Sequence, residues 1–432
     1  MTEIATNVKE PTKLENDPIY DMLSSFGKEL YYAPNDILSQ SAEAKGKAKQ
    51  FNATIGIATE ENEPMHFDHI QQHFTGYDPA DIYPYAPVAG KQELRNAWRN
   101  KLIKDNPKLQ NKTFGLPIVT NAITHGLSIT GELFIDEGDT VILPDKYWEN
   151  YETVLRDRRS ATFSTYPLFN DIGQFNVSGL KETLLDQKTA GKAIVILNFP
   201  NNPTGYTPSI KEAEGIRDAL YEAAELGINI VVILDDAYFG LFYEDSMQES
   251  MFGYLLDIHP RILPIKVDGA TKENYVWGLR VGFITFGISN SFVLNTMEIK
   301  TKEVIRGTIS SGSNLSQTVI LKSLQSEVFD SEKQEKYELM QCRANKVRQV
   351  LDKEKYHTHW DYYPFNSGYF MCLRLKTVDA EELRVHLLNE YGVGTISINS
   401  TDLRIAFSSV EERYIEELFE RIYKGVLDLS SN

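Results

Sequence analysis

Short apolar runs rich in β-branched residues alternate with helical patterns through the middle of the chain, from about residue 90 to residue 325. Three of these runs span residues 193–197, 228–234 and 262–267. Continuous apolar runs of this length are typical of strands that are buried on both faces of a parallel sheet. Their alternation with helical patterns predicts βαβ units. We therefore expect an α/β fold in which a mostly parallel sheet is flanked by helices.

One of the intervening helices has recognisable signals at both ends. Ser209 and Glu212 form a capping-box pattern at its start, and Gly227 suits its C-terminal end. After the sheet, residues 326–345 form a long charged helical pattern. The remainder predicts a smaller α+β unit, with strands at 369–373 and 403–407, a helix at about 380–390, and a closing helix opened by Ser409 and Glu412.

The length of the chain indicates two domains, because 432 residues are too many for one ordinary hydrophobic core. We predict a flexible N-terminal arm at 1–18, a large cofactor-binding α/β domain at 81–329, and a small α+β domain made of 19–80 and 330–432. The N-terminal segment is polar and lacks an apolar core, and no apolar run approaches about 18 residues. A cytoplasmic location is therefore expected.

Composition excludes several classes of function. A net charge of −17 argues against unaided binding to nucleic acids or membrane surfaces, because both are polyanionic. Cys342 and Cys372 lie far apart without CxxC spacing, so neither a disulfide framework nor a zinc site is expected. His66, His69 and His73 lie at helical spacing, but no carboxylate-rich strand end accompanies them. We interpret them as surface or packing residues and predict no metal site.

Polar side chains follow each of the three apolar runs. Asn202 follows the first, Asp235 and Tyr238 follow the second, and Lys272 follows the third. Ligands of parallel sheets bind at the carboxyl ends of the strands, so an amide, a carboxylate and an amine are expected to converge there. Pyridoxal phosphate chemistry requires a lysine that bonds to the cofactor aldehyde and an acid that faces the pyridine nitrogen.

Each of these residues has a role in that chemistry. Asp235 would keep the ring nitrogen protonated, while Asn202 and Tyr238 would donate hydrogen bonds to the ring 3-oxygen. Lys272 would hold the cofactor and then move a proton as general acid and base. A lone lysine is usually a solvated surface residue, but Lys272 follows a buried strand and precedes Arg280 by eight residues. Asp235 and Asp236 together suggest magnesium as an alternative, which the neighbouring amide, tyrosine and lysine disfavour.

These motifs resemble those of the fold-type I, pyridoxal-phosphate-dependent aminotransferases of class I/II, the group that includes aspartate aminotransferase. Residues 198–205 match the family's NPTG segment, Asp235 and Tyr238 match D-x-x-Y, and Lys272 is followed by G-x-R-x-G at 278–282. The resembling motifs extend from about residue 83 to residue 407. The resemblance implies a large domain with a mostly parallel, seven-stranded type of sheet and a smaller α+β domain.

The resemblance also implies roles for residues around the cofactor. Arg280 would bind the phosphate, together with a turn at Ala122, Ile123 and Thr124. The alternative for this turn is an ordinary strand-turn-helix without a phosphate. Thr271 would take part of the role of a phosphate-site serine, which in this chain is replaced by Gly269. The family also usually has a glycine where this chain has Ala122. The aromatic that stacks on the ring would be Trp148, with Tyr147 as the rival and a buried core aromatic as the alternative.

Substrate and subunit contacts follow from the same resemblance. Arg404, with Asn202, would bind the substrate α-carboxylate, the alternative being an exposed strand arginine. Tyr85 would reach the phosphate of a neighbouring subunit, which implies a homodimer with shared active sites. Arg306 would enter the partner's site and pair with a side-chain carboxylate, as in dicarboxylate-specific members. A structural or phosphate-facing arginine is the alternative for Arg306.

The predicted activity is transfer of an amino group from an L-amino acid to a 2-oxo acid by ping-pong chemistry, with an acidic or aromatic donor favoured. Small molecules are the expected substrates, and neither nucleic acid nor membrane is an expected partner. A β-lyase on the same fold remains an alternative, because it would share Lys272, Asp235 and Arg404. A non-catalytic sensor is disfavoured, because the N-terminal segment contains no basic recognition helix.

Overall fold

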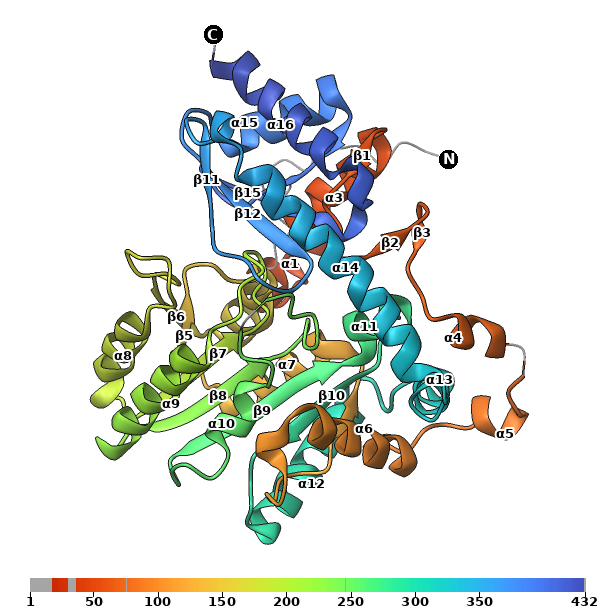
Figure 1. The fold of residues 1–432 in the computed structure, drawn as a ribbon. Coiled ribbons are helices and arrows are strands. Elements are labelled where there is room, and N and C mark those ends of the chain that lie inside the picture. Colours follow the sequence, from red (N-terminus) through yellow and green to blue (C-terminus); the bar gives the residue numbers. More distant parts are fainter. Residues whose placement is uncertain (1–17, 30–35, 75, 245, 431–432) are drawn as a thin grey trace.

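The computed structural model describes residues 18–29, 36–74, 76–244 and 246–430. The predicted N-terminal arm, residues 1–18, lies almost entirely outside the described residues. The described chain contains a seven-stranded sheet with helices on both faces and a separate four-stranded sheet, and a long helix leads from one to the other (Figure 1). The expected α/β class is therefore confirmed.

The three apolar runs form adjacent strands in the middle of the large sheet. Strand β10 is antiparallel to both of its neighbours, and the other strands of this sheet run parallel to one another. In spatial order the strands are β4 (Ile118–Thr120), β10 (Gly282–Phe286), β9 (Ile262–Gly269), β8 (Asn229–Asp235), β7 (Lys192–Asn198), β5 (Thr140–Pro144) and β6 (Thr162–Tyr166).

Helices cover both faces of this sheet, which explains why its central strands are apolar on both sides. Gly126 of α7 lies so close to Val267 of β9 that a Cβ atom would stand 2.6 Å from a valine methyl. On the opposite face, Trp98 of α6 stacks on Phe283 with ring centroids 4.2 Å apart. The helices around the sheet are α6 (Gln92–Asp105), α7 (Ala122–Phe134), α8 (Val177–Leu185), α9 (Ile210–Glu225), α10 (Met251–Leu255), α12 (Ser291–Thr308) and α13 (Asn314–Leu324) (Figure 1).

The start and the end of α9 agree with its sequence signals. Ser209 Oγ accepts a hydrogen bond from the Glu212 amide at 3.3 Å, and the Ser209 amide donates to Glu212 Oε2 at 2.7 Å. Gly227 follows the helix with φ of +97°, a left-handed conformation that glycine adopts without strain.

The second sheet is antiparallel and contains the strand that carries Arg404. Its order is β11 (Trp360–Tyr362), β12 (Phe370–Leu375), β15 (Asp402–Ala406) and β14 (Ile396–Ser397). Helix α14 (Phe329–Leu351) leads into it, as the charged pattern predicted. Helices α15 (Ala380–His386) and α16 (Ile415–Ser430) follow. Ser409 does not open the closing helix, because its hydroxyl instead donates to the carbonyls of Asn52 and Ala406, and this prediction was wrong.

An N-terminal segment packs beside the second sheet rather than beside the first. Strand β1 (Phe51–Asn52) pairs in parallel with β13 (Val393–Gly394), and α3 (Ile37–Lys47) precedes it. The remaining α-helices and strands are α1 (Pro18–Asp21), α2 (Ser25–Glu29), β2 (Thr59–Glu60), β3 (Glu63–Pro64), α4 (Asp68–His73), α5 (Pro79–Ile82) and α11 (Ala270–Glu273). Within the described residues, no helix is both long and apolar enough to cross a bilayer.

Candidate active site

A pocket of about 470 Å³ lies at the carboxyl ends of the central strands of the large sheet, where α3 and the second sheet also contribute residues. Every predicted site residue lines it except Tyr85 and Arg306. The predicted residues among those that line the pocket are Ala122, Ile123, Thr124, Trp148, Asn202, Asp235, Tyr238, Thr271, Lys272, Arg280 and Arg404. The wall formed by α3, which includes Ile37 and Leu38, was not predicted from the sequence.

Asp235 is the last residue of β8 and is held in a fixed orientation. Its Oδ2 accepts a hydrogen bond from Tyr151 Oη at 2.6 Å, and its Oδ1 accepts one from the Ala237 amide at 3.1 Å. Burial raises the pKa of the Asp235 carboxyl, although the Tyr151 hydroxyl and the nearby Lys272 oppose this rise. A carboxylate in such a site is stabilised most by a cationic N–H, which is what a protonated pyridine nitrogen presents.

Two residues of this arrangement were missed by sequence reasoning. Tyr151 lies three residues after Trp148. This spacing from a predicted pocket aromatic was the only sequence signal that Tyr151 lies near the site. Asn198 ends β7 opposite Asp235; its Nδ2 donates to the Asp235 carbonyl at 2.8 Å and its Oδ1 accepts from the Asn202 amide at 2.8 Å. Asn198 therefore connects the Asn202 loop to the end of β8.

Lys272 lies on α11, immediately after β9, and its Nζ is 5.0 Å from the centre of the Tyr238 ring. Burial and, to a lesser extent, the positive charge of Arg280 lower the pKa of Lys272 to about 8, against the opposite effect of Asp235. A much larger fraction of this amine is consequently neutral near pH 7 than for an exposed lysine. The neutral amine is the form that attacks an aldehyde.

The phosphate-binding residues come from two neighbouring segments. Ala122, Ile123 and Thr124 begin α7, where unpaired backbone N–H groups favour an anion. The buried Thr271 Oγ1 has no hydrogen-bond partner among the described residues, and Arg280 also lines the pocket. A phosphate would satisfy this orphaned hydroxyl, so the donors present fit pyridoxal phosphate.

The structure explains why this site lacks the usual serine. A Cβ atom on Gly269 would stand 2.7 Å from the Val281 carbonyl oxygen and 2.8 Å from the Gly282 Cα atom. No side chain fits there, because β9 and β10 approach each other closely at this point. Thr271, two residues after Gly269, supplies a hydroxyl group to the pocket.

Ala122 has the backbone conformation of a glycine, with φ of +63°. Ala122→Gly is therefore expected to increase the free energy of unfolding by about 0.5–1 kcal/mol, after the loss of one buried methyl is subtracted from the relieved strain. Urea unfolding of the protein without added cofactor measures this. Ala97→Gly, in the interior of α6, is the control and should decrease stability by a similar amount. Equal destabilisation by both substitutions would contradict the proposed strain.

Trp148 and its rival Tyr147 occupy different environments. Trp148 lines the pocket and contacts Tyr151 edge-on, with ring centroids 5.6 Å apart. Tyr147 instead donates to Glu152 at 2.6 Å and packs against Phe163 outside the residues that line the pocket. Only Trp148 of the two is therefore placed to cover a ring in the pocket.

Arg404 extends from β15 into the pocket and is 3% exposed. Its Nη1 donates to Asn202 Oδ1 at 3.0 Å, and its Nη2 donates to the Thr54 carbonyl at 3.0 Å. Its guanidinium carbon lies 4.4 Å from the centre of the Phe370 ring. Burial lowers the pKa of Arg404 to about 10, which still leaves it charged at neutral pH. Arg404 is thus a fixed cation suited to a carboxylate.

The other polar candidates do not enter this pocket. Asp236 faces the opposite side of the sheet, where it accepts hydrogen bonds from Ser250 and Lys266, so it does not form a pair of metal ligands with Asp235. No group of histidine, cysteine or acidic residues in the described part of the chain could hold a metal ion. His69 is buried and bonds to Glu332 and Ser323, whereas His66 is exposed, and the His73 side chain lies outside the described residues.

Comparisons with known proteins agree with this geometry. The family model of the class I and II aminotransferases matches residues 67–422. A probable aspartate/prephenate aminotransferase of Aquifex aeolicus is 29% identical over 201 residues, which are 46% of this chain and 48% of the relative. The aspartate aminotransferase of Bacillus sp. YM-2 is 26% identical over 61% of this chain and 63% of the relative. The chain thus spans less than two thirds of the length of either relative.

Solved structures share the fold at lower sequence identity. An aminotransferase of Anaerococcus prevotii superposes with a TM-score of 0.83 at 21% identity, over 93% of this chain and 98% of the other. Kynurenine aminotransferase of Pyrococcus horikoshii in complex with PMP gives a TM-score of 0.79 at 17% identity, over 95% and 98%. These likenesses concern the fold, whereas the family model covers most of the sequence. The chain belongs to the class I and II aminotransferase family.

Proposed function

We propose that this protein transfers an amino group from an L-amino acid to a 2-oxo acid by a ping-pong reaction. The observation that carries the proposal is that Lys272, Asp235 and Arg404 line one pocket. Pyridoxal phosphate is the cofactor of this family, and when bound it supplies an electron sink for the electron pair that stays on the substrate Cα atom after its proton has left. A covalent lysine, an acid and a carboxylate-binding arginine are the residues that this chemistry needs.

Each of the main pocket residues has a separate role in the proposed reaction. Arg404 binds the α-carboxylate of donor and acceptor alike, because both substrates have that group. Lys272 would accept the proton from the substrate Cα atom and then act as the proton donor, which its lowered pKa permits near neutral pH. Asp235 would stabilise the protonated ring nitrogen, and Asn202 and Tyr238 would donate to the ring 3-oxygen. Trp148 would cover the ring and exclude water from that side.

The names of relatives support an acidic or aromatic amino donor. The two curated relatives are named for aspartate/prephenate and aspartate, and one structural neighbour is named for kynurenine. The α3 wall of the pocket presents the apolar Ile37 and Leu38 together with the cationic Lys45. Such a mixed wall suits either class of side chain.

We further propose a homodimer with shared active sites. Tyr85 is 95% exposed and Arg306 is exposed on α12, and neither lines the pocket of its own chain. An exposed tyrosine and arginine of this kind are available to the active site of a partner. The large cofactor-binding domain at 81–329, the small domain at 19–80 with 330–432, and a cytoplasmic location complete the proposal.

The deciding experiment is the visible absorption spectrum of the protein loaded with pyridoxal phosphate, recorded before and after addition of single L-amino acids without an acceptor. We expect the yellow band of the lysine-bound cofactor to convert to the pyridoxamine form with one or a few amino acids, which would identify the donor. Accumulation of pyruvate and ammonia with a persistent band would instead support the β-lyase. Absence of any band would contradict the proposal.

Arg306→Ala tests the predicted contact across the dimer. If Arg306 pairs with a side-chain carboxylate, KM for glutamate or aspartate should rise about tenfold more than KM for a neutral amino acid, because one charge-assisted contact is lost. Steady-state kinetics on both substrate classes measure this difference. Lys302→Ala on the same helix is the matched control and should change neither KM. An equal effect of Arg306→Ala on both classes would indicate a structural role.

A further inference from the structure

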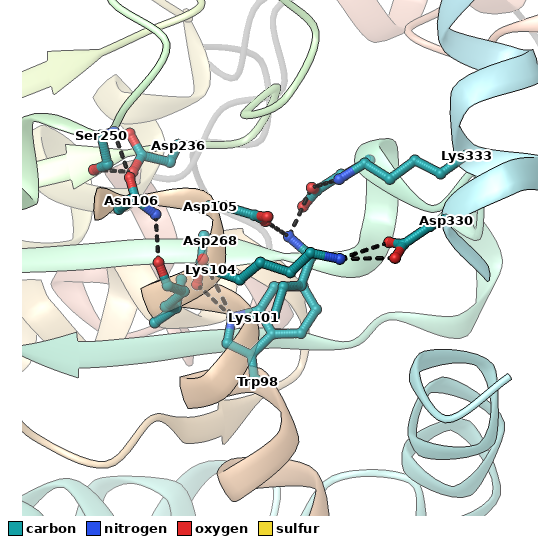
Figure 2. Close-up of polar contacts among 12 residues, drawn as sticks. Trp98, Lys101, Lys104, Asp105, Asn106, Asp236, Ser250, Asp268, Asp330 and Lys333 are labelled. Carbon is teal, nitrogen blue, oxygen red and sulfur yellow. Dashed lines mark hydrogen bonds and ion pairs between the residues drawn. The ribbon is translucent and has the colours of Figure 1, made fainter. Parts of the chain in front are cut away.

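The residue next to Lys272 is a buried carboxylate held by two lysines. Glu273 is 4% exposed, and its Oε1 accepts from Lys101 Nζ at 2.7 Å and from Lys333 Nζ at 2.5 Å. Figure 2 shows both lysines directed to this point from different helices, Lys101 from α6 and Lys333 from α14. Burial raises the pKa of Glu273, but the two ammonium groups outweigh it and lower the pKa to about 2, so the carboxylate is charged at any working pH.

The backbone of Lys272 is held as well. Tyr369 Oη donates to the Lys272 carbonyl oxygen at 3.0 Å, and the Tyr369 side chain is fully buried. The Tyr369 ring also contacts Tyr238 edge-on, with centroids 5.3 Å apart. Tyr369 immediately precedes β12, which pairs with the β15 strand that carries Arg404. One hydrogen bond therefore connects the lysine segment to the sheet that carries the carboxylate-binding arginine.

These contacts fix an otherwise short and weak element. Helix α11 has four residues, Ala270–Glu273, which are too few to form a stable helix alone. A buried carboxylate is an expensive way to stabilise a fold, since an apolar residue of similar size would avoid the cost of removing charges from water. Directional hydrogen bonds from three separate elements instead restrict the position of α11. Buried polar groups are better suited to fixing a position than to adding stability.

We propose that Glu273, Lys333 and Tyr369, here called the lysine clamp, are positioning residues that fix Lys272 against the cofactor and connect its position to the second sheet. This inference rests on the proposed function only in requiring that Lys272 hold the cofactor. Because Tyr369 adjoins the second sheet and Lys333 lies on α14, their contacts would pass a displacement of either element on to α11.

Two mild substitutions test the clamp. Tyr369→Phe removes one hydroxyl, and Lys333→Met removes one charge from a side chain that is 25% exposed, so both proteins should fold. Tyr243→Phe is the control for the first, because Tyr243 is also buried and donates to a backbone carbonyl, that of Gly368, at 2.7 Å. Lys104→Met is the control for the second, because Lys104 pairs with Asp330 at the exposed ends of the same two helices (Figure 2).

The primary measurement is the visible circular dichroism of the protein loaded with pyridoxal phosphate in the absence of substrate, since the band reports how the ring is oriented by its lysine. We expect both clamp variants to lose at least about half of the band intensity and kcat to fall about 10- to 100-fold, with KM changed little. Succinate, a carboxylic acid without an amino group, should change the band of the native protein and change it much less in the variants. The controls should behave as the native protein.

The possible outcomes separate this inference from the proposed function. Clamp variants whose bands, succinate responses and kcat equal those of the controls would overturn the clamp while leaving the cofactor assignment intact. A native protein that shows no cofactor band would overturn both. Loss of band intensity in the clamp variants alone, even in a protein that proves to be a lyase, would support the clamp.

Discussion

Lys272→Ala is expected to reduce kcat by about 10⁴-fold or more, because under the proposed function it removes both the covalent attachment of the cofactor and the group that moves the proton. The visible band of the lysine-bound cofactor should disappear. Lys272 lies beside Tyr238 in the pocket with a pKa lowered to about 8, so no exposed lysine can replace it. Absorption spectra and single-turnover kinetics of the purified variant measure both effects.

Lys272→Arg separates the loss of the positive charge from the loss of the covalent bond and the base. It restores a positive charge beside Asp235 but cannot form the covalent bond or act as a base near neutral pH. We expect it to be as inactive as the alanine variant while retaining more of the stability of the native protein. Turnover of Lys272→Ala at the native rate would refute the assignment of this lysine.

Asp235→Ala should reduce kcat by about 10²- to 10³-fold, because under the proposed function the ring nitrogen loses the carboxylate that keeps it protonated. The native carboxylate is 2% exposed and is oriented by Tyr151 and the Ala237 amide. Among the described residues, no second carboxylate lines the pocket. Asp235→Asn preserves the shape and removes only the charge, so it should be nearly as slow if charge is the cause. Steady-state kinetics at saturating cofactor test both variants.

Tyr151→Phe is the matched control for this prediction. It removes the 2.6 Å hydrogen bond to Asp235 but leaves the carboxylate in place, so its kcat should fall by about tenfold at most. Thermal unfolding of each variant shows whether a loss of activity reflects the site or the fold. An Asp235→Ala protein within a few-fold of the native rate would remove Asp235 from the mechanism.

The two aspartates at the end of β8 are adjacent in the sequence but lie in different environments. Asp235 enters the pocket, whereas Asp236 bonds to Ser250 and Lys266 on the α6 side of the sheet. Successive residues of a strand point to opposite faces, so the pair divides between a site and a buried ion network. Asp268, two strand positions beyond Lys266, joins the same network through its ion pair with Lys266. Asp268 also accepts a hydrogen bond from Trp98 Nε1 (Figure 2).

The location of the main pocket residues can be predicted from short stretches of sequence. Apolar runs form strands wherever they can be buried on both faces, and the residues that follow parallel strands must meet at one edge of the sheet. For this reason the positions of Asn202, Asp235 and Lys272 directly after such runs are enough to predict that they lie together. The start of α9 is equally predictable, because a capping box depends on residues three positions apart.

The distant groups that hold the pocket residues in place are set by tertiary packing alone. The Tyr151 bond to Asp235 joins residues 84 positions apart, and the Tyr369 bond to Lys272 joins residues 97 positions apart. The close approach of β10 that forces glycine at 269 and the left-handed turn at Ala122 are likewise results of packing. Local pattern determines an element and the residues at its ends, whereas contacts between elements depend on how the whole chain packs, which no short stretch of sequence encodes.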